Sequence, residues 1–416
     1  MAIPFSPEQL VAAARQYGTP LWCYDAATIQ ARIAQLHAFD VVRYAQKASS
    51  NLHLLRLIRE AGVRVDAVSL GEIERALLAG FSPTNGGIVF TCDLFDEATL
   101  KRVVELQVEV NAGSIDMLRQ LGEQSPGHRV WLRINPGFGH GHSRKTNTGG
   151  ENSKHGIWHD QVDEALAVIR QHNLHLVGLH MHIGSGVDYD HLEQVGAAMV
   201  AAVKSLDHDI EAFSIGGGLS TPYRDGDTPV DVQRYANAWK VAREEIEAYL
   251  GHGVHMEIEP GRFLVAEAGC LVSEVRVVKD AGQHHFVLVD TGFNDLMRPA
   301  MYGAYHGMSL LDANGQAVQR PQRPTVVGGP LCESGDIFTQ DDECLTPRLL
   351  PQAQVGDLLV LHDTGAYGAS MSSNYNSRTL LPEVLFENGQ PKLIRRRQPL
   401  ADLLALELEL ELELGL

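Results

Sequence analysis

The eleven residues VVRYAQKASSN, Val41–Asn51, contain the pattern from which we predict the fold. Val41–Ala45 is rich in β-branched and aromatic residues and predicts a strand, after which the chain is mainly polar from Lys47 to Asn51. A lysine at the end of a buried strand loses hydration, which frees its amine to act as a nucleophile. On this stretch alone, a surface lysine at a strand end is the simpler interpretation. Motifs elsewhere in the chain distinguish it from a nucleophilic lysine.

Short β-branched runs recur as far as residue 258 and alternate with stretches of helical pattern. The predicted strands are Val41–Ala45, Arg64–Val68, Ile88–Thr91, Val108–Asn111, Val130–Ile134, Leu176–His182, Ala212–Ile215 and Val254–Ile258. Predicted helices between them include Gly71–Ala79, Glu97–Leu106, Ser114–Leu121 and Gln161–Gln171. Eight strands that are mostly followed by helices predict an α/β fold, a (β/α)8 barrel of the TIM type. A doubly wound open sheet is the alternative, but no GxGxxG motif follows the first strand.

A second domain is predicted where the pattern changes after Glu267 to strands without intervening helices. These strands are Leu271–Val278, Phe286–Val289, Pro324–Val327, Asp357–His362, Glu383–Phe386 and Lys392–Arg396. They predict an all-β domain, a sandwich or a barrel. We therefore place the α/β barrel at residues 29–266 and the β-domain at residues 1–28 and 267–400. For residues 401–416, which end in the repeat LELELELELGL, the charge density predicts a frayed terminus.

Composition restricts the class of protein. The 416 residues include 34 basic and 52 acidic side chains, and the net charge of −18 argues against a nucleic-acid or anionic-membrane binder. The five cysteines are scattered without CxxC spacing, which indicates a reducing compartment. No signal peptide and no apolar run of membrane-spanning length is recognisable, so we expect a cytoplasmic protein that binds neither membranes nor nucleic acids.

The segment Gly137–His155, GFGHGHSRKTNTGGENSKH, interrupts the alternation after the fifth predicted strand. It is rich in glycine, asparagine and histidine and predicts a long loop at the barrel mouth. Its histidines, taken with His180, would permit a metal site. Their spacing is irregular, however, so we predict no metal.

The polar residues of chemical interest lie at the C-terminal ends of the predicted strands, where barrel enzymes carry their active sites. They are Lys47, Asp66, Arg133, His182–Gly186, Gly216–Gly218 and Glu259–Arg262, on the first, second, fifth, sixth, seventh and eighth strands. Glycines after strands seven and eight allow backbone amides to approach an anion closely. Together with Ser185 and the turn Gly261–Arg262, they predict a phosphate site.

His182 is ambiguous by itself, because with His180 it forms an HxH pair that would suit a metal-dependent hydrolase. A metal-dependent hydrolase would need carboxylate ligands that are not evident in the sequence. This hypothesis also does not explain Lys47 and the glycines. A phosphate site, a lysine and a nearby carboxylate together indicate pyridoxal 5′-phosphate. Lys47 would form the Schiff base, and Glu259 would keep the ring nitrogen protonated, which makes the ring a strong electron sink suited to decarboxylation.

Eight motifs resemble, in their order along the chain, those of the diaminopimelate decarboxylase family. They are YAQKASSN, DAVSLGEIERALLAG, HMHIGSG, GGGLS, EIEPGRFL, FNDLMRPAMY, GPLCESGD and HDTGAYG. The resemblance extends to Arg397 and implies a barrel plus a β-domain in a homodimer whose active site is shared between subunits. It also implies the pyridoxal-phosphate-dependent conversion of meso-2,6-diaminopimelate to L-lysine and carbon dioxide, the last step of lysine biosynthesis. The loop Gly137–His155 departs from the HPxIxTG form of many members.

The resemblance further implies roles for individual residues. Lys47 resembles the Schiff-base lysine, His182 the residue that stacks on the cofactor ring, and Glu259 the partner of its nitrogen. The phosphate ligands would come from Ser185, Gly217, Gly261 and Arg262, and the cofactor site would also include Asp66, Arg133 and Pro260. Arg262, Arg298 and Tyr302 resemble contacts of substrate carboxylates, and Cys332 resembles the proton donor. Glu333 resembles the residue that binds the distal amino group, and Tyr367 a residue that touches both cofactor and substrate.

Two alternatives stay open from the sequence. A decarboxylase of the same fold could act on ornithine, lysine or arginine, but these substrates lack a second carboxylate for Arg298 and Tyr302. A non-catalytic pyridoxal-phosphate-binding protein would not need Cys332 as a proton donor. Taken singly, Cys332 could also be a structural thiol and Arg298 an ordinary ion-pair partner.

Overall fold

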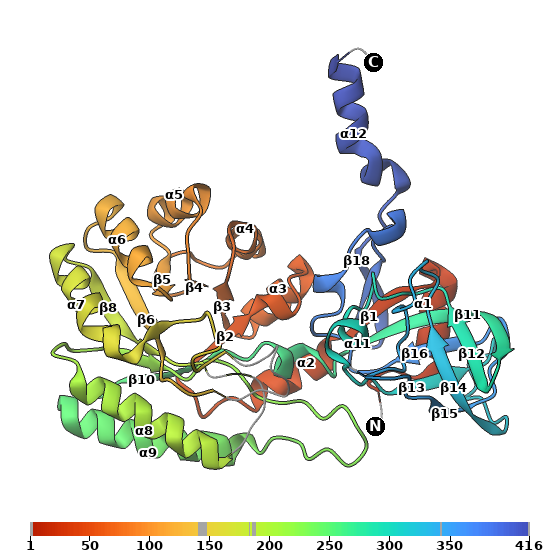
Figure 1. Cartoon of the computed structure of the whole chain (residues 1–416), viewed down its shortest axis with the longest axis horizontal. Helices are drawn as coiled ribbons and strands as arrows, with labels where there is room; N and C mark the ends of the chain where they lie inside the picture. The colour runs from red at the N-terminus through yellow and green to blue at the C-terminus, as the bar shows by residue number, and fades with distance from the viewer. Residues whose placement is uncertain (1–2, 140–147, 183, 185–188, 342, 415–416) are drawn as a thin grey trace. The chain divides into compact units, whose positions relative to one another are not determined.

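The computed structural model describes residues 3–139, 148–182, 184, 189–341 and 343–414, and Figure 1 shows the chain. The chain divides into two compact units. The barrel unit consists of Gln30–Thr221 and Thr228–Leu264, and the β-unit consists of Met1–Ile29, Pro222–Asp227 and Val265–Leu416. Helix α2 (Ala26–Ala34) contains the first boundary between them.

The barrel unit is a closed ring of parallel strands, as predicted. In chain order they are β2 (Val41–Ala45), β3 (Arg64–Ala67), β4 (Ile88–Cys92), β5 (Glu109–Ala112), β6 (Arg129–Asn135), β8 (His175–His180), β9 (Ala212–Ser214) and β10 (His255–Ile258). Each strand pairs with the next in this order, and β10 returns to pair with β2, which closes the ring. The two-residue strand β7 (Ile157–Trp158) pairs with β6 outside the ring. All the pairings are parallel, so the C-terminal ends of the strands meet at one end of the barrel.

Helices connect the strands and cover the ring. They are α3 (Leu52–Glu60), α4 (Leu70–Ala79), α5 (Glu97–Leu106), α6 (Ile115–Gln124), α7 (Val162–Gln171), α8 (Tyr189–Ser205) and α9 (Val232–Leu250). Figure 1 shows the strands between α4–α7 on one side and α8 and α9 on the other. Several helices begin where a polar side chain accepts a backbone N–H of the first turn, at Asn51, Ser69, Asp96, Ser114 and Asp231. The turns η1 (Gln46–Ala48) and η3 (His159–Gln161) follow β2 and β7.

The β-unit is built on a nine-stranded mixed sheet. Its strands are β1 (Leu21–Asp25), β11 (Gly269–Ala281), β12 (His284–Val289), β13 (Met308–Leu311), β14 (Gln322–Gly328), β15 (Arg348–Pro351), β16 (Leu358–Leu361), β17 (Glu383–Glu387) and β18 (Gln390–Arg395). Strand β1 lies inside this sheet, antiparallel to β11 and parallel to β17. The N-terminal segment therefore packs with the C-terminal half of the chain. The unit also contains α1 (Pro7–Tyr17), α11 (Arg298–Tyr302), η4 (Ala369–Met371) and η5 (Tyr375–Ser377), and α10 (Arg262–Val265) contains another boundary with the barrel unit.

Three features of the β-unit differ from the sequence-based expectations. The four-residue strands β13 and β15 were not predicted, because runs as short as MSLL and RLLP carry no alternation that would reveal them. The C-terminal repeat, expected to be frayed, forms helix α12 (Leu400–Leu414). Leucine and glutamate are both strong helix formers, and without a partner strand their alternation does not produce a strand.

Among the described residues, no helix combines the length and apolarity that spanning a membrane would require.

A buried ion pair lies inside the barrel. Arg43 of β2 is 1% exposed, and its Nη2 lies 2.7 Å from Oε2 of Glu257 on β10, the strand that closes the ring. Its Nη1 donates to the carbonyl of Gly86. Taking two charges out of water is costly, so each depends on the other and on the hydrogen bonds around it.

We expect Glu257→Gln to lower the free energy of unfolding by roughly 3–5 kcal/mol, because the Arg43 guanidinium would stay buried without its counter-charge. The midpoint of urea unfolding measures this. The matched control is Glu244→Gln, which removes an exposed pair with Lys240 at 3.9 Å and should change the midpoint little. Equal midpoints for the two variants would contradict a stabilising role for the buried pair.

Candidate active site

Lys47 lies just beyond the C-terminal end of β2, in the turn η1. Its neighbours Gln46 and Ala48 are fully buried, and the turn is held by hydrogen bonds from Tyr44 Oη to the Ser49 carbonyl and from Gln46 Nε2 to the Glu72 carbonyl. The Lys47 side chain itself is exposed. The expectation of a dehydrated lysine was therefore wrong for the free chain, because β2 ends at Ala45 and Lys47 lies in the turn that follows it.

Two acidic side chains lie within electrostatic reach of Lys47. Asp66 of β3 is 3% exposed, and its Oδ1 has no hydrogen-bond partner among the described residues. Burial raises the pKa of Asp66, and the charge of Glu259 raises it further, while Lys47 opposes both. Burial also raises the pKa of Glu72. Lys47 therefore lies within electrostatic reach of two acidic groups whose pKa values are raised by burial.

Glu259, directly after β10, is a barrel carboxylate held by two side-chain hydrogen bonds. His180 Nε2 lies 2.8 Å from its Oε2, and Ser214 Oγ donates to its Oε1 at 3.2 Å. Burial by itself would raise the pKa of Glu259, but the charge and hydrogen bond of His180, with Arg43, lower it below its ordinary value. Glu259 is therefore a buried anion at neutral pH.

Sequence reasoning treated His180 only as half of an HxH pair and did not find Ser214. The two residues are direct neighbours in the β8–β9 pairing, where His180 lies opposite Ser214. Strand pairing is a tertiary contact, so no local pattern could have revealed that they share Glu259.

Among the described residues, no cluster of three potential metal ligands is found.

His182 packs against the glycine turn that follows β9. The backbone N–H of Gly217 donates to Nδ1 of His182 at 3.1 Å. Burial lowers the pKa of His182 well below its ordinary value, and the charges of Arg133 and Lys47 lower it further. A neutral ring that accepts at Nδ1 carries its hydrogen on Nε2. A Cβ on Gly217 would lie 2.6 Å from the Glu259 carbonyl, so this turn requires glycine.

The remaining predicted barrel residues surround the same charges. Arg133 of β6 is 8% exposed and interacts electrostatically with Asp66 and Glu259. Pro260 and Gly261 are buried, and Arg262 opens α10 half-buried. Ser185 lies outside the described residues, as does the part of the predicted loop from 140 to 147. The barrel end thus brings together Lys47, Asp66, Arg133, His182, Gly217 and Glu259.

The other predicted residues belong to the β-unit. Arg298 is 7% exposed and begins α11, and Tyr302 ends this helix. Cys332 and Glu333 are exposed on the loop after β14. Tyr367 has φ of +57°, a left-handed conformation that is uncommon for a bulky residue and is often found at functional sites.

Two further residues hold the Cys332 loop: Asn376, which lies outside the quoted motifs, and Asp336, which ends the motif GPLCESGD. Asn376 accepts a hydrogen bond from the Cys332 backbone N–H at 2.9 Å. Asp336 accepts from the backbone N–H groups of Leu331 and Phe293, both at 2.7 Å. The backbone at Leu331 and Cys332 is therefore held by side chains of the β-unit.

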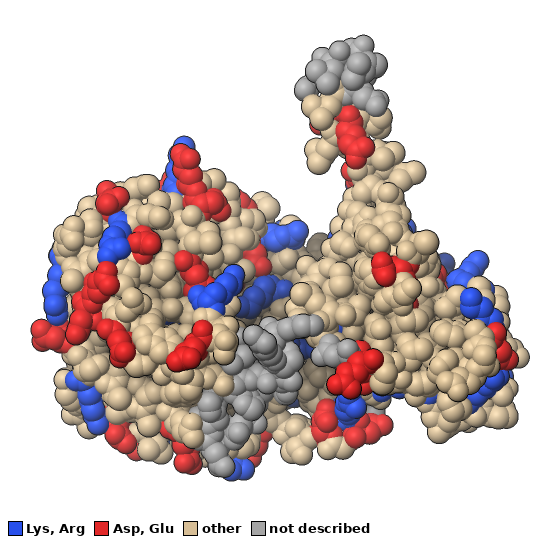
Figure 2. Space-filling view, viewed as in Figure 1, with Lys and Arg blue, Asp and Glu red and all other residues tan. Residues whose placement is uncertain are grey.

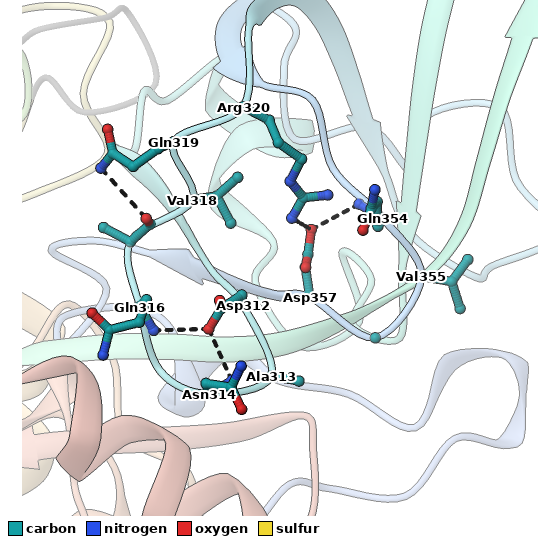
Figure 3. A pocket seen from close by; sticks show the side chains of 12 residues that line it. Asp312, Ala313, Asn314, Gln316, Val318, Gln319, Arg320, Gln354, Val355 and Asp357 are labelled. Atoms are coloured by element: carbon teal, nitrogen blue, oxygen red, sulfur yellow. Dashed lines mark hydrogen bonds and ion pairs between the residues drawn. The ribbon is translucent and has the colours of Figure 1, made fainter.

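A pocket of about 680 Å³ in the β-unit lies apart from these residues. Figure 3 shows it between the segment Asp312–Arg320 and the turn Gln354–Asp357, with Arg320 paired to Asp357. It is lined by none of the predicted site residues, so we do not assign it to the active site. On the visible face of the molecule, Figure 2 shows acidic and basic side chains interspersed.

Comparisons with known proteins show the family of the chain. The family described as "Pyridoxal-dependent decarboxylase, pyridoxal binding domain" matches residues 26–266. Diaminopimelate decarboxylase of Escherichia coli (strain K12) is 64% identical over 405 residues, covering 96% of both chains. The chain belongs to the diaminopimelate decarboxylase family. The Streptomyces coelicolor member is 62% identical, covering 96% of this chain and 92% of its own.

Solved structures of the family agree as closely. A crystal structure of diaminopimelate decarboxylase has a TM-score of 0.95 at 63% identity and covers 97% of this chain and 96% of its own. The Helicobacter pylori diaminopimelate decarboxylase complexed with L-lysine has a TM-score of 0.87 at 30% identity, covering 96% and 99%. As a family member, the protein is a carboxy-lyase whose cofactor is pyridoxal 5′-phosphate.

The barrel end of this family member fits that cofactor on three observations. A phosphate needs closely approaching N–H groups, and the turn at Gly217 has no room for a side chain. A protonated ring nitrogen needs a buried anion, which Glu259 supplies. An aldehyde needs a primary amine, and Lys47 carries one at the same strand ends.

In the β-unit, a chain of polar contacts extends from Arg298 to the end of β16. Arg298 Nη1 lies 2.9 Å from His306 Nε2, and His306 Nδ1 lies 2.9 Å from the His362 carbonyl. The His362 ring bonds Ser309 Oγ at 2.9 Å. Burial lowers the pKa of His362 to about 4, so this ring is neutral at neutral pH.

We expect His362 to make the stability of the protein sensitive to mild acid. Below its ordinary pKa the unfolded chain binds a proton at His362, while the folded chain does not until about pH 4. The free energy of unfolding should therefore fall by roughly 3 kcal/mol between pH 6.5 and 4 on account of this group. Urea unfolding of the wild type and of His362→Gln, compared across this range, measures the difference. The control variant His37→Gln, at an exposed histidine, should run parallel to the wild type; a parallel His362→Gln curve would contradict the prediction.

Proposed function

We propose that this protein removes carbon dioxide from meso-2,6-diaminopimelate to give L-lysine, the last step of lysine biosynthesis. The observation that carries the proposal is Glu259, a buried carboxylate kept ionised by His180 and Ser214 beside the glycine turn. The name of relatives that share 64% of the sequence over nearly the whole chain supports the choice of substrate.

In the proposed site the barrel residues bind and orient the cofactor. The Lys47 amine would hold it covalently, and Glu259 would keep a proton on its ring nitrogen. His182 would lie neutral against the ring. The phosphate is bound at Ser185, Gly217, Gly261 and Arg262, while Asp66, Arg133 and Pro260 complete the cofactor site. When bound, pyridoxal phosphate supplies the electron sink that accepts the electron pair left by carbon dioxide.

The β-unit residues act on the substrate. Arg298 and Tyr302, with Arg262, bind its carboxylates, because a guanidinium can hold a carboxylate with two parallel hydrogen bonds. Glu333 binds the distal amino group, and Tyr367 contacts both substrate and cofactor. Cys332, whose backbone is held by Asn376, returns a proton to the carbon that has lost carbon dioxide.

The purified protein should release carbon dioxide from meso-diaminopimelate and do so at least about 100-fold more slowly from L-lysine or L-ornithine, which leave the second carboxylate contact unmade. Lys47→Ala should lose the visible absorbance of bound cofactor and at least about a thousandfold in turnover. The matched control, Lys204→Ala at an exposed lysine paired with Glu245, should keep both. Full turnover in Lys47→Ala, with folding verified, would remove the mechanism.

We further propose that the protein works as a homodimer in the cytoplasm, with each active site shared between subunits. Lys47 and Glu259 belong to the barrel unit, whereas Cys332 and Glu333 belong to the β-unit. A two-fold dimer would let the β-unit of one subunit complete the barrel site of the other. All five cysteines are free thiols, which supports a reducing compartment.

Mixing two inactive variants tests the shared site. Lys47→Ala and Cys332→Ala should each be nearly inactive, but a heterodimer would contain one site with both residues intact. Random exchange puts about half of the dimers in this form with one working site of two, so roughly a quarter of wild-type activity should return. If verified subunit exchange restores no activity, both residues act within one chain.

A further inference from the structure

We propose that His306 is a positioning residue that fixes Arg298 for binding the carboxylate that the substrate keeps. His306 is 2% exposed and lies in the β-unit between α11, which begins with Arg298, and β13. The inference rests on the proposed function, in which Arg298 contacts that carboxylate. No motif singled out in the sequence pointed to His306.

The hydrogen bonds of His306 allow only one form of its ring. Nδ1 lies 2.9 Å from the His362 carbonyl, which can only accept, so Nδ1 carries a hydrogen. Nε2 lies 2.9 Å from Arg298 Nη1, and a guanidinium can only donate, so Nε2 presents a lone pair. His306 is therefore neutral and accepts a hydrogen bond from Arg298. The opposite tautomer or the protonated ring would direct an N–H at the guanidinium.

The anchor of His306 is a strand end of the sheet. Strands β13 and β16 pair with Met308 opposite Leu361, and the His362 N–H donates to the Gly307 carbonyl at 2.9 Å. A Cβ on Gly307 would lie 3.0 Å from Nδ1 of His362, so the segments that contain these two residues approach closely here. The carbonyl that orients His306 is thus fixed by the sheet. Because His306 in turn accepts a hydrogen bond from Arg298, it fixes the position of the guanidinium.

Tyr223 holds the same two side chains from another direction. Its ring packs edge-on against the His306 ring, with centroids 5.4 Å apart and planes at 84°. The Arg298 Cζ atom lies 4.7 Å from the centroid of Tyr223, within cation–π range. An arginine already fixed by an acceptor and an aromatic ring loses less freedom when it binds a carboxylate. The expected effect of His306 is therefore on affinity for that carboxylate and not on the bond that breaks.

A pair of ligands isolates this effect. L-lysine, the proposed product, keeps the carboxylate assigned to Arg298, and 1,5-diaminopentane is the same molecule without it. Binding of both to the holoenzyme, measured by calorimetry, reports on the Arg298 contact without turnover. Arg298→Lys should abolish most of the preference for L-lysine while His306 is intact, because lysine cannot form the planar two-bond fork.

Two substitutions of His306 separate positioning from packing. In His306→Asn the side-chain N–H can still reach the His362 carbonyl, but the acceptor for Arg298 is lost. We expect the KM for meso-diaminopimelate and the Kd for L-lysine to rise about tenfold, the effect of one hydrogen bond. The kcat, the cofactor absorbance and the affinity for 1,5-diaminopentane should stay within about twofold.

In His306→Gln the side-chain oxygen can occupy the place of Nε2 and accept from Arg298, so L-lysine affinity should return to within about threefold of wild type. Tyr223→Leu should weaken L-lysine binding in the same direction, by about threefold. His285→Asn, which removes another buried β-unit histidine paired with Asp280, should leave all these values unchanged. Should His306→Asn fail to fold, the glutamine and Tyr223 variants decide.

The outcomes that overturn the inference differ from those that overturn the proposed function. Equal weakening of L-lysine and 1,5-diaminopentane in His306→Asn, or a fall in kcat with KM unchanged, would refute positioning of Arg298 by His306. Failure of the glutamine variant to recover L-lysine affinity would do the same. A wild type that binds both ligands equally would instead refute the assignment of Arg298 to a carboxylate, and a wild type inert towards diaminopimelate would refute the proposed function.

Discussion

Closure of the parallel barrel by the pairing of β10 with β2 is the constraint on which the candidate site depends. Lys47 follows the first barrel strand and Glu259 the last, more than two hundred residues later. Hydrogen bonding between these strands makes their ends neighbours. Every other barrel residue of the site follows from the same geometry, because parallel strands in a closed ring present all their C-terminal ends at one place.

Burial sets the chemistry of the charges within that ring. Arg43 and Glu257 neutralise each other inside the barrel. Glu259 has no arginine in direct contact among the described ion pairs and depends on His180 and Ser214 to remain ionised. At Asp66, burial outweighs the hydrogen bond from Thr91 and raises the pKa. The pKa values of these two buried carboxyl groups thus shift in opposite directions, because the charge and hydrogen bond of His180 outweigh burial only at Glu259.

In the β-unit, contacts from loop residues hold the candidate site residues in position. Asn376 and Asp336 fix the backbone around Cys332 while leaving the thiol exposed. His306 and Tyr223 contact the Arg298 guanidinium itself and keep it buried. The residue proposed to move a proton is thus held through its backbone, and the residue proposed to recognise charge is held through its side chain. These supports come from segments far apart in the chain and meet only in the folded unit.

The sequence by itself determined the barrel strands, all eight to within two residues at each end, because β-branched runs and intervening helical periodicity are local patterns. It also determined the candidate residues Lys47, His182, Gly217, Glu259 and Cys332, which lie in recognisable motifs. Only the tertiary structure decided that Lys47 is exposed, that His180 and Ser214 share Glu259, and that His306 holds Arg298. The reason is physical: exposure, strand pairing and hydrogen bonds across a sheet depend on residues distant in the chain, and no local pattern records which of them will meet.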